Sequence, residues 1–453
     1  MAVVLIAGAS SRLEAQTCLV DPSFIPALEP GADIYGMAVQ PDGKLLIGGA
    51  FVAAGSIRVT NLARLNIDGS LDPTFDPLTA VDIGYVNAIT IQPDGQILVG
   101  GNFYSSLSLN QGIMTRLNPD GSEDPSFDYN LFIDTGVNTI LLQPDGKIVI
   151  GGAFVVVDFL LRRNIARLNA NGTLDATFDA CVASSDGAGA TSLTLLSDGK
   201  ILATGSFSFS TGYTRNGLAR LRESGDLDPD FAPEPGVDSS SSVFALRMRP
   251  DGRLLMGGNF RSYHSVPRAG LVQLTAEGEV DFSFDPADGI EAGGSVFTIA
   301  LQSDGKAIAG GSFTNYSGVP YAGVARINTN GVADPVCNPG AGANNWVSTL
   351  LLQPNGKLLT GGKFSRFNGS VRNGICLLQN GSVQPRLSLP VFLNDALLMS
   401  LYGEIGVQYV IEASSNFTDW MAVTNFTAIA AKQTIRDPDA ASSGARFYRA
   451  RTN

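Results

Sequence analysis

The chain carries the stretch Gln40-Pro41-Asp42-Gly43-Lys44-Leu45-Leu46-Ile47-Gly48-Gly49-Ala50-Phe51, which returns in altered form as far as Gln353-Pro354-Asn355-Gly356-Lys357-Leu358-Leu359-Thr360-Gly361-Gly362-Lys363-Phe364. The turn glycines of the seven copies stand at Gly43, Gly95, Gly146, Gly199, Gly252, Gly305 and Gly356, so successive steps are 52, 51, 53, 53, 53 and 51 residues. A period of about fifty residues is typical of propellers, solenoids and other repeat arrays. The sequence therefore predicts a repeat protein.

Each copy predicts four short strands that follow one another as a meander. The first is an alternating run such as residues 86–91, and the Asp-Gly turn then leads into the Gly-Gly-x-Phe strand. After a long loop, residues 63–66 predict a third strand, and a second turn at Asp68-Gly69 leads into a fourth over residues 71–75. Glycine stays in all seven first turns because a tight hairpin turn needs a positive φ there. With 52 glycines and 16% charged residues, the predicted class is all-β.

A closed ring of copies would bury the apolar faces of every sheet. One sheet cannot bury both of its apolar faces, whereas a ring of blades buries every face and leaves only short outer edges. Residues 21–24 match a fourth strand that has no first three strands before it, and the last copy stops after a third strand at residues 375–378. We therefore expect residues 18–24 to pair beside residues 374–378 and to close a seven-bladed β-propeller over residues 17–384.

Arginine in the third strand and aspartate in the fourth form a second regularity. The pairs are Arg64 with Asp72, Arg116 with Asp124, Arg167 with Asp175, Arg220 with Asp228, and Arg326 with Asp334. Counting outward from the turn places the two residues opposite each other; in the fifth copy Gln273 faces Asp281, and in the closing sheet Cys376 faces Asp21. Such pairs fix the register and contribute about 0.2–1 kcal/mol each, so we interpret them as structural.

The phrases QPDGK, GGxF and ARLNxDGSLDPTFDP, at this spacing, resemble the delta-60 repeat family of bacterial β-propeller-like proteins. The resemblance covers about residues 18–383. It implies a propeller architecture and an exported, often multidomain, bacterial setting. It implies no reaction and no catalytic residues.

The composition changes after Gln384, where a second resemblance begins. Residues 409–420 and 446–450 resemble a small β-sandwich module found at the C-termini of exported bacterial proteins. Alternating apolar positions from Leu387 to Ile411 allow a compact sandwich similar to fibronectin type III domains. We assign residues 385–453 to this module, as a tether, a sorting module or a spacer.

The N-terminus and the net charge bear on location and partners. Residues 1–9 are apolar and a small-residue cleavage site follows at Leu13-Glu14-Ala15, so we interpret residues 1–16 as a signal peptide remnant, with a plain hydrophobic tail as the alternative. The expected location is secreted or cell-surface. No other segment has eighteen consecutive apolar residues, so no membrane insertion is expected. A charge of −12 opposes binding to nucleic acid or anionic membranes, and we expect a monomer.

Metal and disulfide signals are weak in this sequence. The four cysteines Cys18, Cys181, Cys337 and Cys376 lack CxxC spacing, and we interpret them as buried small apolar residues rather than a disulfide framework. His264 is the only histidine, which excludes a multi-histidine metal centre. The loop from Asn66 to Asp72 is similar to a calcium loop, but later copies change its polar residues and keep its glycine. No cofactor is expected, with calcium as the alternative.

The long connections are the candidate binding surface. Because the strands are antiparallel, these connections share one face of the ring, and rigid scaffolds commonly display binding residues on such loops. The aromatic and histidine candidates there are Tyr104, Phe209, Tyr213, Tyr263, His264, Tyr316, Tyr321 and Phe367, which suit stacking on sugars or gripping a protein. The acidic candidates, close to the mouth of the predicted central channel, are Asp82, Asp134 and Asp288. The alternative is that the aromatic residues cover seams between blades and the acids cap backbone amides.

These features favour a non-enzymatic, exported binding or structural protein whose loop face meets a glycan or protein partner. Two alternatives stay open. A propeller glycosidase or polysaccharide lyase would need convergent catalytic groups; hydrolysis needs two acids, one with a raised pKa, and fold alone does not imply activity. A passive spacer in a surface assembly would have no pocket at all.

Overall fold

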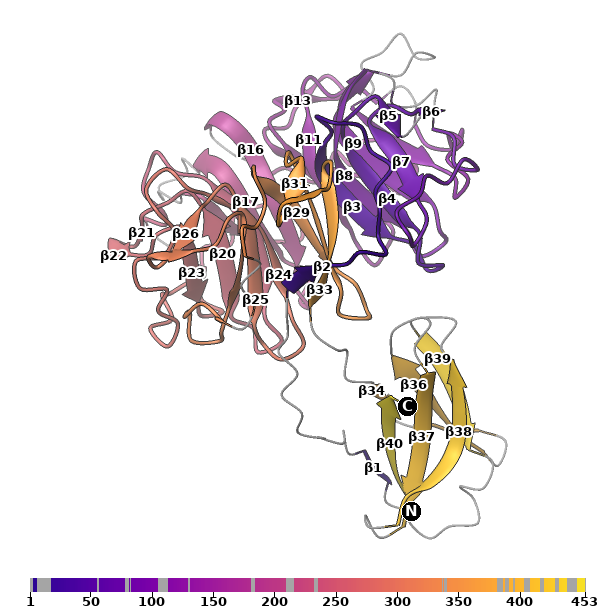
Figure 1. Ribbon diagram of the computed structural model, residues 1–453. Helices are drawn as coiled ribbons and strands as arrows, with labels where there is room; N and C mark the ends of the chain where they lie inside the picture. Colours follow the sequence, from indigo (N-terminus) through magenta and orange to yellow (C-terminus); the bar gives the residue numbers. More distant parts are fainter. Residues whose placement is uncertain are drawn as a thin grey trace.

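The computed structural model describes residues 3–5, 18–54, 57–77, 81, 83–104, 113–128, 131–180, 184–208, 216–231, 235–335, 337, 340–380, 386–387, 391–393, 396–402, 408–415, 419–427, 432–437 and 446–452. Every regular element within these residues is a β-strand, in agreement with the all-β prediction (Figure 1). The same residues contain no helix that is long and apolar enough to cross a membrane.

Each of the seven copies forms an antiparallel sheet with three strands in chain order. The first strands are β3 (Asp33–Val39), β8 (Ile83–Ile91), β11 (Val137–Leu142), β16 (Ser184–Leu195), β19 (Val243–Met248), β24 (Val296–Leu301) and β29 (Val347–Leu352). The second strands are β4 (Leu45–Ala50), β9 (Ile97–Tyr104), β12 (Ile148–Gly152), β17 (Ile201–Ser208), β20 (Leu254–Gly258), β25 (Ala307–Gly311) and β30 (Leu358–Gly362). The third strands are β7 (Leu62–Leu65), β10 (Met114–Leu117), β15 (Ile165–Leu168), β18 (Leu218–Leu221), β23 (Leu271–Leu274), β28 (Val324–Ile327) and β33 (Ile375–Asn380).

The predicted fourth strand is wrong for the first six copies, where a single bridge replaces it. In the first copy this bridge joins Leu65 to Leu71. Asp72 then turns the chain, because its Oδ1 accepts hydrogen bonds from the backbone N–H of Thr74 at 3.0 Å and from the Thr74 hydroxyl at 2.7 Å. Pro73 lacks the N–H that a continuing ladder would need.

Within the described residues, short hairpins lie in five of the long loops between the second and third strands. They are β5 (Ala53–Ala54) with β6 (Ile57–Arg58), β13 (Val156–Val157) with β14 (Leu160–Leu161), β21 (Ser262–Tyr263) with β22 (Val266–Pro267), β26 (Asn315–Tyr316) with β27 (Val319–Pro320), and β31 (Arg366–Phe367) with β32 (Ser370–Val371). Isolated bridges such as Ile290 to Tyr316 join these hairpins to the connection that enters the first strand of the same copy. The two kinds of long connection are therefore neighbours, as the antiparallel order predicts.

The N-terminal strand β2 (Cys18–Val20) adds to the last copy as a fourth strand. It pairs antiparallel with β33, with Cys18 opposite Asn380 and Val20 opposite Leu378, which is the pairing expected from the sequence. One detail differs, because the N–H of Asp21 donates to the carbonyl of Leu377 at 2.8 Å. Leu377, and not Cys376, therefore faces Asp21.

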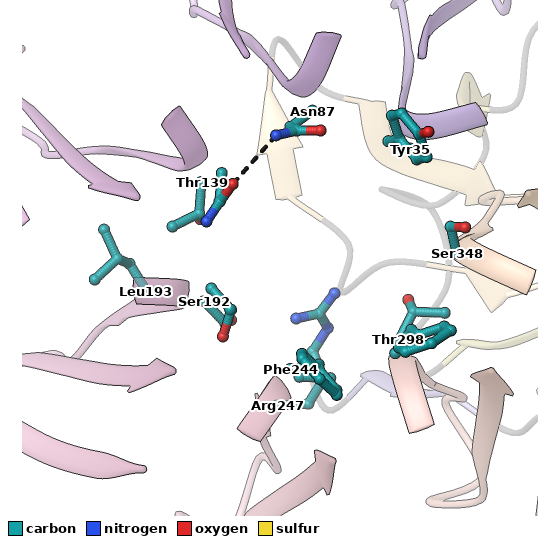
Figure 2. A pocket seen from close by; sticks show the side chains of 13 residues that line it. Tyr35, Asn87, Thr139, Ser192, Leu193, Phe244, Arg247, Thr298 and Ser348 are labelled. Carbon is teal, nitrogen blue, oxygen red and sulfur yellow. Dashed lines mark hydrogen bonds between the residues drawn. The ribbon is translucent and has the colours of Figure 1, made fainter. Parts of the chain in front are cut away.

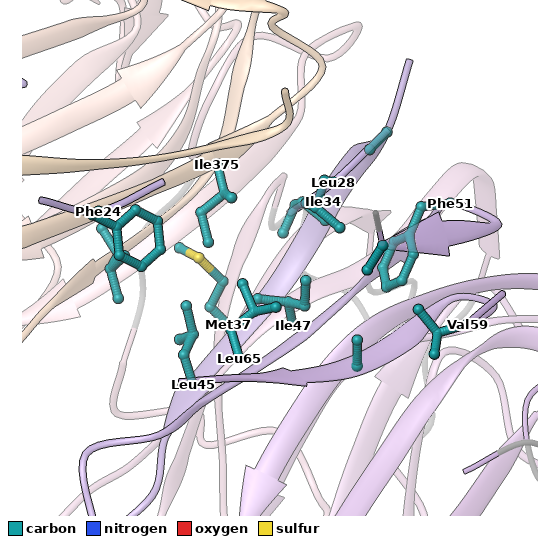
Figure 3. Close-up of a cluster of buried hydrophobic side chains, with 14 of the residues drawn as sticks. Phe24, Leu28, Ile34, Met37, Leu45, Ile47, Phe51, Val59, Leu65 and Ile375 are labelled. Carbon is teal, nitrogen blue, oxygen red and sulfur yellow. The ribbon is translucent and has the colours of Figure 1, made fainter. Parts of the chain in front are cut away.

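The first and last copies also share one hydrophobic core (Figure 3). Phe24 and Ile34 belong to the same buried cluster as Leu359 and Ile375. In addition, the side-chain amide of Asn373 donates to the carbonyl of Leu28 at 2.9 Å. The two ends of the repeat region are thus joined by a strand pair, a hydrogen bond and buried apolar surface.

A disulfide between Cys18 and Cys337 corrects the interpretation of the cysteines. It connects residues 319 positions apart, with Cα atoms at 5.1 Å. Cys337 occupies the place of a phenylalanine in other copies, and the addition of β2 to β33 brings Cys18 to it. Cys376 is a buried free thiol, and burial raises its pKa to about 12. Cys181 lies outside the described residues.

The predicted arginine and aspartate pairs are present. Arg64 Nε lies 2.7 Å from Asp72 Oδ2, and Lys44 Nζ lies 2.8 Å from the same oxygen. The Arg64 guanidinium also lies 4.9 Å from the centre of the Phe75 ring and donates to the carbonyl of Pro119 in the next copy at 2.6 Å. Burial would raise the pKa of Asp72, but hydrogen bonds from Lys44, Thr74 and Arg64 outweigh burial and hold it well below its usual value. Arg64, Arg116 and Arg167 each donate to a carbonyl of the next copy in this way, so these three pairs join their own register to the neighbouring copy.

The fifth copy keeps the same chemistry with two residues exchanged. The first copy has Gln40 in the first strand region and Arg64 in the third strand, whereas the fifth has Arg249 and Gln273 at these positions. Arg249 Nε donates to Gln273 Oε1 at 2.5 Å, and Gln273 Nε2 donates to Asp281 at 2.8 Å. The fifth copy therefore lacks the arginine and aspartate pair because arginine and glutamine have exchanged positions. Its arginine still joins the aspartate through the glutamine.

Thr204 offers a test of packing in the fourth copy, where it takes the position of the first glycine of the pair. It is fully buried, and its hydroxyl has no hydrogen-bond partner within the described residues. A buried unpaired polar group costs about 1–3 kcal/mol, so we expect Thr204→Val to raise the free energy of unfolding by about 1 kcal/mol in urea denaturation. Thr360→Val is the matched control and should lower it, because the Thr360 hydroxyl donates to the carbonyl of Cys376 at 3.2 Å. The same effect from both changes would contradict this assignment.

The C-terminal residues form two further sheets. One has the order β1-β40-β37-β38 and the other has β34-β36-β35 with β39 also paired to β36. The strands are β1 (Val3–Leu5), β34 (Arg386–Leu387), β35 (Val391–Leu393), β36 (Ala396–Tyr402), β37 (Gln408–Ser414), β38 (Met421–Thr427), β39 (Lys432–Asp437) and β40 (Arg446–Thr452). Met399 and Ile435 of one sheet and Ile411 and Tyr448 of the other share one buried cluster. Within the predicted signal peptide remnant, Val3–Leu5 pairs in parallel with β40.

Candidate functional site

Each first strand skips one residue at the same place in its register with the second strand, and β16 has a further shift between Ser184 and Gly189. In β3 the pairing passes from Ile34 directly to Gly36, and in β24 from Val296 directly to Thr298. The residues skipped in this way are Tyr35, Asn87, Asn138, Thr191, Phe244, Phe297 and Ser348. Such a bulge turns a side chain away from the regular alternation of the sheet.

The glycine pair of the repeated stretch is what allows this bulge. A Cβ atom on Gly49 would lie 2.0 Å from the carbonyl oxygen of Asp33, which comes two residues before the skipped Tyr35. A Cβ atom on Gly311 would lie 1.9 Å from the carbonyl oxygen of Ser295. No side chain fits at these distances, so the second glycine in the second strand permits the bulge in the first.

All seven skipped residues line one cavity of about 410 Å³ (Figure 2). Asn87, Asn138 and Thr191, from three successive copies, form a polar wall. The Asn138 amide donates to the carbonyl of Ala190 at 3.2 Å and the Thr191 hydroxyl to that of Val243 at 2.6 Å, so these side chains also join neighbouring first strands.

The next two copies form an aromatic wall. Phe244 and Phe297 meet edge to face with ring centres 5.4 Å apart, and Trp346 lies 6.5 Å from Phe297. The amine of Lys363 lies 5.1 Å from the centre of the Trp346 ring. Polar and aromatic side chains therefore line opposite parts of the same space.

Among the described residues that line this cavity, Arg247 is the only charged one. Figure 2 shows its guanidinium extending into the space between the strands. Its Nη1 donates to the carbonyl of the adjacent Leu246 at 2.8 Å. The residue is exposed to solvent, and desolvation by the protein around its guanidinium lowers the pKa of that group below its usual value.

Asp33 is the acid closest in sequence to the cavity lining. Its Oδ2 accepts a hydrogen bond from the Tyr35 hydroxyl at 3.1 Å. Burial raises the pKa of the Asp33 carboxyl, and burial together with the nearby Asp33 charge raises the pKa of Tyr35 to about 12. Both groups therefore hold their protons more tightly than usual.

Four of the aromatic candidates of the long loops are buried, which argues against their assignment as ligand contacts. Tyr263, Tyr316 and Phe367 are 0% exposed and Tyr321 is 1% exposed. The hydroxyl of Tyr263 donates to the carbonyl of Gly278 at 2.9 Å, and that of Tyr316 to Gly331 at 2.6 Å. The rings complete the cores of the copies, which is the alternative left open by the sequence.

His264 also has a local role. Its ring stacks on Tyr263 with centres 4.3 Å apart, and Nδ1 lies 3.6 Å from Glu279 Oε2. Its φ of 49° places it in the left-handed turn of the hairpin. It does not line the cavity.

The acidic candidates take different places. Asp134 caps its hairpin, because Oδ1 accepts from the N–H groups of Val155 and Val156 at 2.9 and 3.1 Å. Asp288 is exposed on its loop and does not line the cavity. The side chain of Tyr104 and the whole of Asp82, Phe209 and Tyr213 lie outside the described residues.

The calcium-like loop forms a hydrogen-bonded hairpin turn. Asp68 Oδ1 accepts from the Ser70 N–H at 2.9 Å and from its hydroxyl at 2.6 Å, while the Asn66 amide donates to the Ser70 hydroxyl at 2.9 Å. Within the described residues, no group of three or more His, Cys, Asp or Glu side chains could hold a metal ion.

The cavity residues lie in the first strands, whereas the candidates predicted from the sequence lie in the long loops. A signal was present in the repeats: each skipped residue stands five positions before the residue that aligns with Gln40. Tyr, Asn, Asn, Thr, Phe, Phe and Ser occur there, whereas the preceding position is Val, Ile or Ala in every copy. A repeat position whose residue type changes from copy to copy, next to a position that stays apolar, indicates a side chain that does not pack in the core of each copy.

The comparisons with solved structures find distant likenesses. A gluconolactonase from Xanthomonas campestris is 11% identical with a TM-score of 0.36, covering 78% of this chain and 88% of that one. A protein of unknown function from Bacteroides caccae is 16% identical with a TM-score of 0.33, covering 56% and 81%. A xylan β-1,4-xylosidase from Bacillus halodurans is 11% identical with a TM-score of 0.27, covering 93% and 97%. The comparison with curated proteins finds no match.

A family model matches all seven copies, at residues 40–75, 92–127, 143–178, 196–231, 249–284, 302–335 and 353–383. Together these ranges cover more than half of the 453 residues. They coincide with the stretch that the sequence repeats, and they agree with the delta-60-like resemblance. The chain belongs to the family described as "Domain of unknown function (DUF5122) beta-propeller".

Proposed function

We propose that this chain is a non-enzymatic binding protein: a closed seven-bladed propeller whose ligand occupies the central cavity, followed by a small β-sandwich module over residues 385–453. The observation that carries the proposal is the cavity lined by one bulged residue from every copy. Residues contributed by all seven first strands surround a common space most simply when the copies form a ring. The β2 and β33 pair, the Asn373 to Leu28 hydrogen bond and the shared core support closure.

The cavity has the properties of a small-ligand site. Its volume of about 410 Å³ lies within the range of about 300–1,000 Å³ that is usual for such sites. Convergent polar groups beside aromatic surface are also typical of them. The lining lies where the first strands begin, so the proposed entrance is on the face of the long connections, where a glycan can enter.

The enzyme alternative rests on a weaker observation. Glycoside hydrolysis usually requires two carboxyl groups on opposite sides of the bond, about 5–10 Å apart. The cavity lining contains Arg247 and no acid, and Asp33 supplies one carboxyl with a raised pKa beside it. A binding role needs no further group, which is why we favour it. The spacer alternative predicts no cavity.

Export is part of the proposal. The disulfide between Cys18 and Cys337 supports an oxidising compartment, because disulfides persist mainly in secreted and surface proteins. The acidic net charge of −12 fits a partner other than nucleic acid.

A glycan array probed with the full chain, with and without a chelator, tests the proposed function. We expect binding that the chelator leaves unchanged, and we expect Phe297→Ala to weaken the best array ligand about tenfold. The reason is that a lost aromatic contact costs about 0.5–1.5 kcal/mol in addition to the apolar area. The matched control is Phe159→Ala, since Phe159 is 79% exposed on a hairpin and does not line the cavity. Equal affinity of the wild type and Phe297→Ala would reject the cavity as the site.

A further inference from the structure

We propose that the ligand of the central cavity is an acidic sugar, whose anionic group pairs with the guanidinium of Arg247. This inference rests on the proposed function, because it requires the cavity to be the binding site. It adds the chemical class of the ligand and the residue that selects it.

The first argument is the isolation of Arg247. Other arginines of the repeats, such as Arg64 and Arg220, have an aspartate within 2.7 Å. Arg247 has no ion pair within the described part of the chain, and its hydrogen bond is to the carbonyl of its own neighbour. A solvent-exposed guanidinium without an ion pair keeps most of its N–H donors available, and its planar fork suits an incoming carboxylate.

The second argument is that the charge occurs in one copy alone. Arg247 lies opposite Leu255 in the ladder with the second strand. The residues at the equivalent register positions of the other copies are uncharged: Ala38, Thr90, Leu141, Thr194, Ala300 and Leu351. The scaffold therefore does not need an arginine at this point, and the propeller would be complete with alanine or threonine.

The third argument is electrostatic. The protein carries a net charge of −12, yet its cavity lining has one cation and no acid. A cleft lined by charge of one sign focuses the electric field and raises the local concentration of counter-ions. The lining therefore favours an anion although the protein as a whole is acidic.

The fourth argument concerns the two walls. A sugar ring has an apolar face of C–H groups and a polar edge of hydroxyls. Phe244 and Phe297 offer aromatic surface for the face, while Asn87 and Asn138 offer amide groups for the hydroxyls. With Arg247 added, the cavity matches a ligand that combines a ring face, hydroxyls and one negative group.

The test measures binding of matched neutral and charged sugars to the full chain by calorimetry. The probes are galactose, galacturonate and galactose 6-sulfate, of which the last two separate a carboxylate from a sulfate as the anionic group. We expect at least one anionic probe to bind ten times or more tighter than galactose. Arg247→Gln should remove this preference, and Arg247→Lys, which keeps the charge, should retain part of it.

The control is Arg366→Gln, which removes a cation from an exposed hairpin of the long-loop region. Arg366 is outside the cavity lining and its guanidinium donates to the carbonyl of Gly369 at 3.0 Å. We expect it to change affinity for the anionic probes less than twofold. Circular dichroism of each variant verifies that it folds.

The outcomes separate the two proposals. If galactose binds as tightly as the anionic probes, and Phe297→Ala weakens it, the cavity is a sugar site and the anionic ligand is wrong. An anionic preference that Arg247→Gln leaves unchanged would also reject the role of Arg247. If none of the three probes binds, the acidic-sugar proposal is overturned, and the glycan array then decides the proposed function on its own.

Discussion

Loss of the disulfide between Cys18 and Cys337 is expected to lower the free energy of unfolding by about 2–4 kcal/mol, because the bond closes a loop of 319 residues. A cross-link stabilises mainly by restricting the unfolded chain, and the restriction grows with loop length. Here the bond also holds β2, a strand of three residues that completes the last copy. Removing it should free the N-terminal segment and expose the core that Phe24 helps to cover.

The measurement is the free energy of unfolding in urea. It compares the wild type with a double variant that carries both Cys18→Ser and Cys337→Ser, each in the presence and in the absence of a reductant. The reductant should destabilise the wild type and leave the double variant unchanged, which separates the loss of the bond from the effect of the substitutions. Peptide mapping without reduction should find the segments of Cys18 and Cys337 linked. Separate peptides, or equal stability of both proteins, would rule out this role for the bond.

Asp228→Ala is expected to lower the free energy of unfolding by about 1–3 kcal/mol at neutral pH. The aspartate is 0% exposed, and its Oδ2 lies 2.7 Å from Arg220 Nε and 3.0 Å from Lys200 Nζ. Removing it takes away two charge-assisted hydrogen bonds, although Arg220 and Lys200 are 16% and 32% exposed and solvent compensates them in part. Burial would raise the pKa of Asp228, but the hydrogen bonds from Lys200 and Arg220 lower it, so the carboxylate is charged at neutral pH.

The partner substitution should be much milder, and the last copy explains why. There Leu377 takes the arginine position, and Asp21 retains its ion pair with the lysine, Lys357 Nζ, at 3.2 Å. Arg220→Leu copies this arrangement, so we expect it to cost less than Asp228→Ala in the same urea titration. Asp226→Ala, at an exposed turn two residues away, is the matched control and should change stability by less than about 0.5 kcal/mol. A cost below about 1 kcal/mol for Asp228→Ala would show that the ladder does not stabilise the propeller.

Much of the repeat architecture could be predicted because it depends on local pattern. The Asp-Gly turn, the alternating apolar positions and the opposed Arg64 and Asp72 all act within one copy. The fourth strand was the exception, since Asp72 uses its carboxylate to turn the chain at Thr74. A preference for a local turn outweighed the apolar alternation that indicated a strand.

The site was predicted less well, for a related reason. Aromatic residues in long loops suggested solvent-exposed side chains that contact a ligand. Instead, the hydroxyls of Tyr263 and Tyr316 donate hydrogen bonds to backbone carbonyls, and their rings pack in the core. Whether a loop aromatic faces solvent depends on what folds against it, and one sequence does not contain that information. The bulge that releases Tyr35 or Phe297 into the cavity depends on contacts between strands.

The order of residues along the chain was sufficient for the number of copies, the all-β class and the opposed charge pairs, because each arises from neighbours within about ten positions of a turn. Three features required the folded molecule: the bond from Cys18 to Cys337, the exchange of Arg249 and Gln273, and the gathering of seven bulged residues around Arg247. These features join residues from distant parts of the chain or depend on close packing between strands. The residues that form them come into contact only after the copies have packed together. The spacing of residues along the sequence therefore does not predict these contacts.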